Sequence, residues 1–262
     1  MMKHDEQDRT QRHLKLALAA KPIDGATPFV DLIDSGMSSF NARQLSLACR
    51  LLARQLAAGD TRIGLSLSGA LIPAGFGRSC LVPLIRSGFI DWVVSTGANL
   101  YHDLQMALGF EMFAGSPHAD DTALRDDGVI RIYDLYFKSE ALYTTDAFIR
   151  DLFRRFFSEG KIGGKVSSSV VHEALGRELL RLDPRSGEFS VLAAAAEMGV
   201  PLHTSSPGDS GIGLNLAALY LDGVDMCVEP SIDVNETAAY VYQAKRTGGK
   251  SAVVILGGGS PK

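Results

Sequence analysis

The stretch "RIGLSLSGALIPAGFGRSCLVPLIRSGFIDWVVSTGANL", residues 62–100, decides the fold. Its first ten residues have the apolar character of a strand, and the segment 77–88 has that of a helix ending at Gly88. A second strand within 89–100 opens into a loop, and a helix is expected from about Tyr101 to Leu108. Strands and helices that alternate with such short connections predict a parallel sheet.

The same alternation resumes in the second half of the chain. The expected elements are helices at 189–198, from about 214 and at 234–246, and strands at 200–206, 226–231 and 252–256. The fold class is therefore predicted as α/β, a Rossmann-like parallel sheet of about six strands with helices on both faces. Residues 128–137 suit either a further strand or an insertion, and 144–158 an amphipathic helix capped by Thr145 or Asp146.

A single main domain is expected. Residues 1–24 are charged and partly helical in pattern, which indicates an N-terminal arm. Residues 25–262 contain neither an internal repeat nor a low-complexity linker, so we predict that they form one domain.

Composition excludes several classes of partner. The 262 residues carry a net charge of −4 and no basic stripe interleaved with aromatic residues, which argues against nucleic acid. The first residues lack the apolar core of a secretory signal, and no apolar run reaches the roughly 18 residues that span a bilayer. These features favour a cytoplasmic protein that does not bind a membrane.

The cysteines and histidines do not form a motif. Cys49, Cys80 and Cys227 lie far apart, and we expect buried free thiols in a reducing compartment. The six histidines and three cysteines show no HxxxH or CxxC spacing, so no metal site is predicted.

Four loops are expected at the carboxyl ends of the strands, where open α/β sheets bind their ligands. Each is rich in Gly, Ser or Thr, which lets backbone N–H groups approach anionic oxygens. The loops are "SLSGALIPAG" (66–75), "STGANLYHD" (95–103), "TSSPGDSGIG" (204–213) and "GGGSPK" (257–262). Four such loops on one edge favour a nucleotide-sized ligand, although none matches a standard fingerprint.

Several residues of these loops allow two interpretations. Asp209 suits either ribose or amine binding or the N-cap of the following helix, and "GDSG" (208–211) allows a nucleophilic Ser210. His102 suits proton transfer or substrate contact, whereas Asp103 is expected in a first helical turn on dipole grounds alone. His203 is expected to be a core or strand residue whose hydrogen bonds are made within the protein.

Two lysines outside the four loops also leave the choice open. Lys161 and Lys165 flank a glycine pair, and they suit either phosphate binding or a solvated loop.

These loops, in this order, resemble the deoxyhypusine synthase family, and in particular its bacterial deoxyhypusine-synthase-like branch. The resemblance extends from about residue 25 to the end. It is carried by "SLSGALIPAGFG", "FIDWVVSTGANLYHDL", "HTSSPGDSGIGLN", "PSIDVNETAA" and "VVILGGGSPK".

The resemblance implies NAD-dependent transfer of an aminobutyl group from spermidine to an acceptor amine, which is a protein lysine or putrescine in known members. It implies a homotetramer with active sites shared between subunits and a polyamine as substrate. By position, the residues implied to contact NAD are Gly69, Ala70, Leu71, Ile72, Pro73, Thr96, Gly97, Ala98, Asp209 and Gly258. The residues implied to contact the polyamine are Tyr101, His102 and Asn215.

The chain also departs from the family pattern. Tyr101 and His102 stand where the synthase proper has two glutamates, which puts true deoxyhypusine synthesis in doubt. The family's lysine nucleophile lies in an "SWGK" segment that follows the glycine triplet, and 1–262 has no such segment. We therefore expect a C-terminally incomplete member whose catalytic lysine lies beyond Lys262 and which alone does not complete the transfer.

Two other functions are possible from the sequence. The first is a catalytically inactive paralogue that acts as an oligomerisation or regulatory partner of an active homologue. The second is a serine hydrolase that uses Ser210, which would need a histidine base beside the serine.

Overall fold

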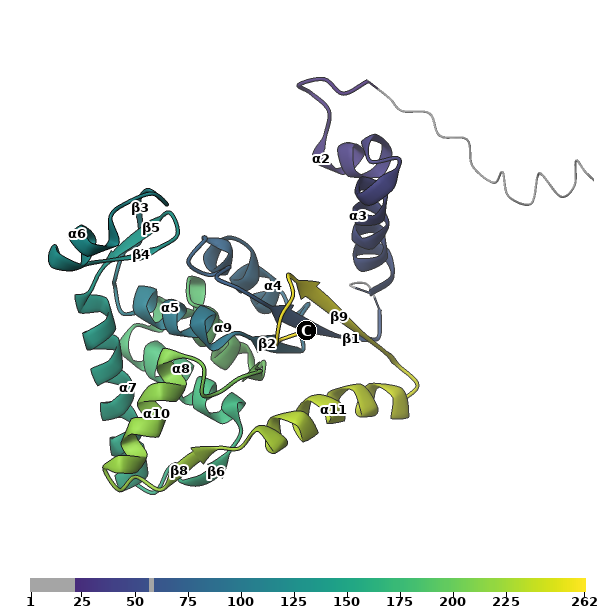
Figure 1. The fold of residues 1–262 in the computed structure, drawn as a ribbon. Helices are drawn as coiled ribbons and strands as arrows, with labels where there is room; N and C mark the ends of the chain where they lie inside the picture. Colours follow the sequence, from purple (N-terminus) through teal and green to yellow (C-terminus); the bar gives the residue numbers. More distant parts are fainter. Residues whose placement is uncertain (1–21, 57–58) are drawn as a thin grey trace, which may run out of the picture. The chain divides into compact units, whose positions relative to one another are not determined.

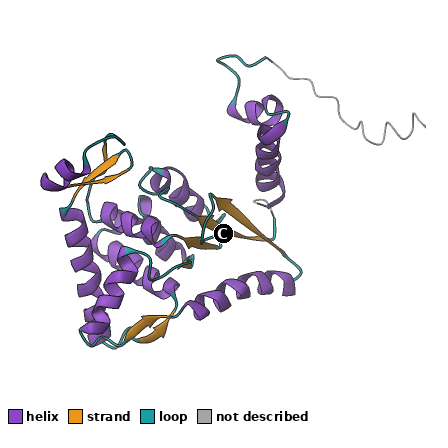
Figure 2. Ribbon diagram, viewed as in Figure 1, coloured by secondary structure: helices purple, strands orange, loops and turns teal. Residues whose placement is uncertain are grey.

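The computed structural model describes residues 22–56 and 59–262, drawn as ribbons in Figures 1 and 2. Most of the arm predicted for residues 1–24 lies outside the described residues. The chain forms two compact units, Met1–Asp60 and Thr61–Lys262. The described part of the first unit is helical, with α2 (Phe29–Asp31), a π-helical turn at Leu32–Gly36, α3 (Phe40–Leu51) and a second π-helical turn at Leu52–Leu56.

The second unit is built on a four-stranded parallel sheet in the order β7-β2-β1-β9 (Figure 2). These strands are β1 (Thr61–Leu67), β2 (Trp92–Ser95), β7 (Leu202–Thr204) and β9 (Lys250–Leu256). Their last residues are in register, because Leu67 pairs with both Ser95 and Leu256, and Ser95 pairs with Thr204. The four following loops therefore start at one level of one sheet edge, as the alternating pattern predicts.

Helices connect the strands of this sheet. A π-helical turn at Gly77–Leu81 and α4 (Val82–Arg86) lie between β1 and β2. Between β2 and β7 lie α5 (Gly97–Ala107), α6 (Asp121–Asp126), α7 (Glu140–Ser158), α8 (Ser168–Leu182), a 3-10 turn (Pro184–Glu188) and α9 (Val191–Met198). Between β7 and β9 lie α10 (Gly211–Leu221) and α11 (Pro230–Arg246). Figure 1 shows α4 on one side of the sheet and α11 on the other.

Close packing fixes these helices. Trp92 of β2 lies over Gly64 of β1, where any Cβ would overlap the indole ring, and Tyr240 of α11 packs on Trp92 with 5.9 Å between ring centroids. A Cβ on Gly176 of α8 would overlap the carbonyl group of Leu192, so the backbones of α8 and the alanine-rich α9 pack closely here. These contacts bury the sequence's long apolar segments in one core.

The sheet is smaller than predicted. The expectation of about six strands in one sheet is wrong, because β8 (Met226–Val228) pairs with β6 (Gly164–Val166) in a separate two-stranded sheet. The 128–137 segment is an insertion: β4 (Val129–Ile132) and β5 (Leu135–Lys138) form an antiparallel hairpin extended by β3 (Phe113–Ala114). Strand propensity specifies that a strand forms but not which strand it pairs with.

Other local predictions are corrected by burial and capping. Helix α7 begins at Glu140, so Thr145 and Asp146 lie inside it and do not cap it. The cysteines are free, but Cys80 and Cys227 are exposed rather than buried. Across the described residues, the helices are too short or too polar to cross a bilayer. Strand β9 forms an edge of the sheet and leaves Val253 and Ile255 nearly half exposed.

Candidate functional site

The four loops contact one another along the carboxyl edge of the sheet. Thr96 Oγ1 donates a hydrogen bond to the Gly69 carbonyl oxygen at 3.0 Å, which joins the loops after β2 and β1. The backbone N–H of Ser68 donates to the Leu256 carbonyl oxygen at 3.1 Å, which joins the loops after β1 and β9. The backbone N–H of Ser205 donates to the Ser95 carbonyl oxygen at 3.4 Å, which joins the loops after β7 and β2. The four segments therefore make one continuous surface, which we call the four-loop edge.

Two helices begin at this edge. Thr96 caps α5 by accepting from the Asn99 N–H at 3.4 Å, and Ser210 caps α10 by accepting from the Gly213 N–H at 3.1 Å. A Cβ on Gly97 would overlap the side chain of Ser210, so a glycine at the start of α5 lets the two N-termini approach each other. Two neighbouring helix N-termini create a positive potential that favours an anion.

The last residues of the chain lie across part of the four-loop edge. Pro261 is buried, and its carbonyl oxygen accepts a hydrogen bond from Ser66 Oγ at 2.8 Å. The hydroxyl groups of Ser260 and Ser205 lie 2.6 Å apart, which joins the loops after β9 and β7. Figure 1 shows the chain ending beside β1.

The residues implied to bind NAD are distributed between surface and core. Gly69, Ala70, Ala98, Asp209 and Gly258 are exposed at the four-loop edge. Leu71 and Thr96 are half-buried, whereas Gly97, Ile72 and Pro73 are buried. The backbone N–H of Ile72 donates to Asn99 Oδ1 at 3.1 Å, so this residue ties its loop to α5. The buried side chains of Ile72 and Pro73 cannot touch a ligand at this surface and can only hold the loop in place.

Asp209 does not cap α10, and Ser210 does not lie beside a histidine base. Ser210, not Asp209, is the N-cap of α10, which leaves the exposed Asp209 carboxylate without a capping role. Among the hydrogen bonds of the described residues, Ser210 Oγ pairs with the Gly213 N–H and with no histidine. The arrangement needed for a serine nucleophile is therefore missing there.

Tyr101 and Asn215 meet at one carboxylate that sequence reasoning did not assign to the site. Tyr101 Oη donates to Asp146 Oδ1 at 2.8 Å, and Asn215 Nδ2 donates to the same oxygen at 2.6 Å. Burial and then the bond to Asp146 raise the pKa of Tyr101 far above its usual value. A Cβ on Gly211 would overlap the Tyr101 ring, so α5, α7 and α10 meet closely here.

Asp146 was hidden from sequence reasoning because it lies 45 residues from Tyr101 and 69 from Asn215. Its position in an amphipathic helix is typical of an ordinary surface acid. The signal that marks it is a half-buried position in α7 beside the buried Thr145 and one turn before the buried Ile149.

His102 is half-buried next to this cluster. Its Nδ1 lies 2.8 Å from Gln105 Oε1, and its ring packs edge-on against Phe137 with 5.9 Å between centroids. Burial lowers the pKa of His102, with the contact to Gln105 acting in the opposite direction. The imidazole is therefore held neutral at pH 7.

Asp103 has a structural role that differs from the predicted one. It is buried and accepts from Ser190 Oγ at 2.7 Å and from the N–H groups of Val191 and Leu192, both at 2.9 Å. Asp103 thus caps the N-terminus of α9 across 87 residues. The prediction that it lies in a first helical turn is wrong, because α5 begins at Gly97 and Asp103 lies in its second turn. Burial raises its pKa, and these three hydrogen bonds act against that rise.

Lys161 lies in a loop, whereas Lys165 lies in β6 and not in a loop as expected. Lys161 pairs with Glu159 at 2.6 Å and Lys165 with Glu229 at 3.0 Å, and both side chains are more than half exposed. The pairing with acids favours a solvated position over phosphate binding for both side chains.

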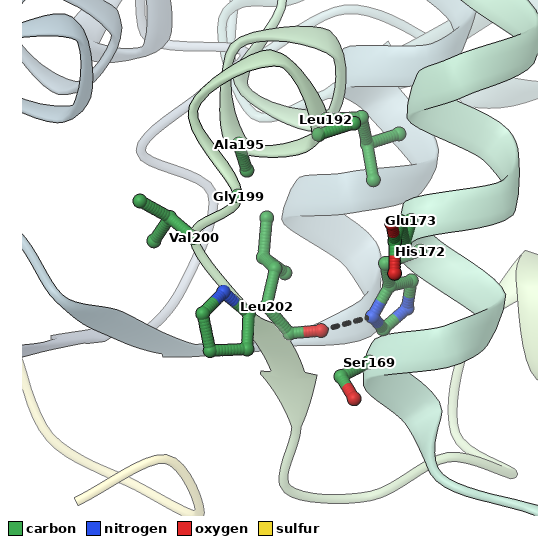
Figure 3. Close-up of a pocket in the computed structure, with 10 residues that line it drawn as sticks. Ser169, His172, Glu173, Leu192, Ala195, Gly199, Val200 and Leu202 are labelled. Carbon is green, nitrogen blue, oxygen red and sulfur yellow. Dashed lines mark hydrogen bonds between the residues drawn. The ribbon is translucent and has the colours of Figure 1, made fainter. Parts of the chain in front are cut away.

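Two cavities lie near the sheet, and only the second of them adjoins the four-loop edge. A cavity of about 110 Å³ lies between α8 and α9, where His172 Nδ1 is 2.7 Å from the Leu202 carbonyl oxygen (Figure 3). Pro201 and Leu202 place it at the amino end of β7, away from that edge. A groove of about 730 Å³ adjoins the edge through Pro207, Gly208 and Gly213, and Tyr220 and Met226 contribute apolar walls.

Known proteins share this sequence pattern and this fold. Residues 32–262 match the family model described as deoxyhypusine synthase. A "Deoxyhypusine synthase-like protein" of Nostoc punctiforme is 49% identical over 253 residues, covering 96% of this chain and 64% of the relative. A "Probable deoxyhypusine synthase 2" of Methanosarcina acetivorans is 35% identical over 243 residues, covering 92% of this chain and 67% of the relative.

The fold comparison agrees with the sequence comparison. The crystal structure of a "putative deoxyhypusine synthase" from Entamoeba histolytica superposes with a TM-score of 0.64 at 14% identity, covering 92% of this chain and 79% of that one. At that identity the likeness concerns the fold alone. The chain spans about 64% of the length of its cyanobacterial relative.

Proposed function

This chain belongs to the deoxyhypusine synthase family, and we propose that it binds NAD at the four-loop edge and serves transfer of an aminobutyl group from spermidine to an acceptor amine. The proposal rests on one observation: the four strands end in register, so the four glycine- and hydroxyl-rich loops that follow them start at the same edge of the sheet. This is the position at which open α/β sheets bind dinucleotides.

The residues present fit an anionic dinucleotide. The N-termini of α5 and α10 point their positive ends at the edge, and Gly97 lets these two N-termini approach each other closely. The Thr204 hydroxyl is buried without a hydrogen-bond partner, and it would lie 3.6 Å from a Cβ on Gly97. Gly69, Ala98 and Gly258 are exposed around these groups. We assign Asp209 to the ribose hydroxyls, because its carboxylate is exposed and caps no helix.

The polyamine is assigned to the cluster formed by Tyr101, Asp146 and Asn215, with His102 beside it. Asp146 supplies a negative charge from α7 where Tyr101 and His102 lack the charge of the family's glutamates. The neutral state of His102 avoids repulsion of a cationic amine. Both hydrogen bonds within the cluster go to Oδ1 of Asp146, which leaves Oδ2 to face an ammonium group.

Bound NAD would supply a hydride acceptor for the carbon next to a substrate nitrogen. The described residues would bind the two molecules and orient them. Asp146 would hold an ammonium group in place, and His102 would accept or return a proton at its free ring nitrogen, Nε2.

The proposal also covers the domain structure and the oligomeric state. Residues 25–262 are proposed to act as one functional domain, and the protein to assemble as a homotetramer with shared sites. Family membership supports the assembly, and the exposed apolar residues of the edge strand β9 leave surface for contacts.

The NAD assignment can be tested by calorimetric titration of the chain with NAD. Replacing Asp209 with Asn should weaken NAD binding by roughly tenfold, because a charged hydrogen bond to ribose is lost. Asp127→Asn is the matched control, since Asp127 is also exposed and lies in the insertion after α6. Absence of NAD binding to the unmodified chain would contradict the proposal and favour an inactive paralogue.

A further inference from the structure

Three metal-ligating side chains converge where β7 passes α11. His203 lies on β7, and Asp233 and Glu236 lie one turn apart on α11; one donor atom from each lies within 4.8 Å of the others. His203 Nδ1 is 3.2 Å from Asp233 Oδ1 and 3.8 Å from Glu236 Oε2. The His203 side chain is 1% exposed and that of Asp233 10%, so this is an interior cluster and not a solvated acidic patch.

Residues at the N-terminus of α8 donate hydrogen bonds to some, but not all, of the carboxylate oxygens in this cluster. The Ser168 N–H donates to Asp233 Oδ1 at 2.8 Å, and Ser169 Oγ donates to Glu236 Oε2 at 3.0 Å. Asp233 Oδ2 is buried and has no hydrogen-bond partner. A buried carboxylate oxygen without a partner is unfavourable, so it indicates that a group is missing from the cluster.

A proton alone does not account for this geometry. If Nδ1 of His203 carries a hydrogen, it donates to Asp233 Oδ1, which already accepts from Ser168, and Oδ2 stays unpaired. If Nε2 carries the hydrogen instead, it donates to Tyr240 Oη at 3.2 Å, and the lone pair of Nδ1 then faces both carboxylates. This second tautomer presents three electron-pair donors to one point, which is the arrangement a cation requires.

We propose that His203, Asp233 and Glu236 bind a divalent transition-metal ion, with Zn²⁺ as the best match. A histidine nitrogen suits Zn²⁺ better than Mg²⁺ or Ca²⁺, which prefer oxygen ligands alone. The two carboxylates balance the charge of the ion. Asp233 ligates through its carboxylate, whose Oδ2 has no other partner and whose Oδ1 accepts from Ser168. The Glu236 side chain, 36% exposed, provides access for water and metal.

The ion has a structural role. Successive residues of a strand point to opposite faces, so His203 faces α11 while Thr204 faces Gly97 at the four-loop edge. The metal therefore ties α11 to β7 on the face away from the proposed NAD site. Sequence spacing cannot reveal it, because its ligands come from elements 30 residues apart rather than from a Cys/His motif.

Zinc titration of the metal-stripped chain, followed by calorimetry and thermal unfolding, tests the proposal. We expect one equivalent of Zn²⁺ to bind and to raise the melting temperature, and a large excess of Mg²⁺ to leave binding unchanged. Asp233→Asn and Glu236→Gln should each weaken Zn²⁺ binding by roughly tenfold or more. His118→Gln, which changes a histidine outside the cluster, should leave it as in the unmodified chain.

The outcomes separate the alternatives. Glu236 is half-exposed, so Glu236→Gln decides the question even if Asp233→Asn does not fold. Loss of binding in Glu236→Gln with binding kept in His118→Gln supports the site. An unmodified chain that takes up no Zn²⁺, or a Glu236→Gln variant that binds as tightly as the unmodified chain, overturns it.

Discussion

Tyr101 in the second turn of α5 donates its hydroxyl hydrogen to Asp146 in the second turn of α7, with 2.8 Å between the oxygens. The same carboxylate oxygen accepts from Asn215 of α10, so one acid joins three helices directly behind the four-loop edge. This cluster positions the elements that carry the proposed NAD and polyamine sites.

Asp146→Ala should lower the free energy of unfolding by roughly 2 kcal/mol, because Tyr101 and Asn215 each lose a charged acceptor in a partly buried place. Urea denaturation measures the change. Asp151→Ala on the same helix is the control, because its side chain is 75% exposed, and it should change the free energy by less than about 0.5 kcal/mol. Equal effects of the two substitutions would contradict a special role for Asp146.

Ala98→Glu should weaken NAD binding by roughly tenfold or more, because it adds a negative charge where the N-terminus of α5 is proposed to hold the diphosphate. The same charge interacts favourably with the helix dipole, so the melting temperature should be unchanged or higher. The neutral variant Ala98→Gln has nearly the same shape and should bind NAD more tightly than Ala98→Glu. Equal NAD affinities in the two variants would place the diphosphate elsewhere.

His172 should make stability depend on pH. Burial lowers its pKa from 6.5 to about 4. Between these pH values the imidazole is protonated in the unfolded chain but stays neutral in the folded chain. The contribution of this group is fully present above pH 6.5 and is lost as the pH falls to about 4, a loss of about 3 kcal/mol.

Comparing His172→Gln with the unmodified chain isolates this contribution, because all other titratable groups are the same in the two proteins. The free energy of unfolding should fall less steeply between pH 7 and pH 4.5 in His172→Gln. His118→Gln, at an exposed-loop histidine, is the matched control and should follow the unmodified chain. Parallel pH curves for all three proteins would show that His172 is not held neutral by burial.

Much of the architecture follows from local sequence. The apolar segments that end at Leu67, Ser95, Thr204 and Leu256 predict both the strands and the edge at which their loops meet. The number of strands in the sheet did not follow, because β8 has the composition of a core strand but pairs with β6. Pairing depends on which surfaces are free after the helices pack, and this is not encoded in any one segment.

The site was predictable only in its loops. Loop residues such as Gly97 and Asp209 could be proposed from the sequence, because glycine and acidic residues are typical of ligand-binding loops. Asp103 and Asp146 have the same type and ordinary helical contexts, yet the first caps α9 across 87 residues and the second joins α5 to α10. Roles that depend on contacts between distant segments become visible only in the folded chain.

Hydrogen exchange of the chain with and without saturating NAD tests the central claim most directly, because it reports on all four loops in one experiment. We predict slower exchange with NAD in the peptides that cover 66–75, 95–103, 204–213 and 257–262, with β4 and β5 unchanged as an internal control. Protection confined to a single loop, or located in the insertion instead, would contradict a dinucleotide site shared by the four loops.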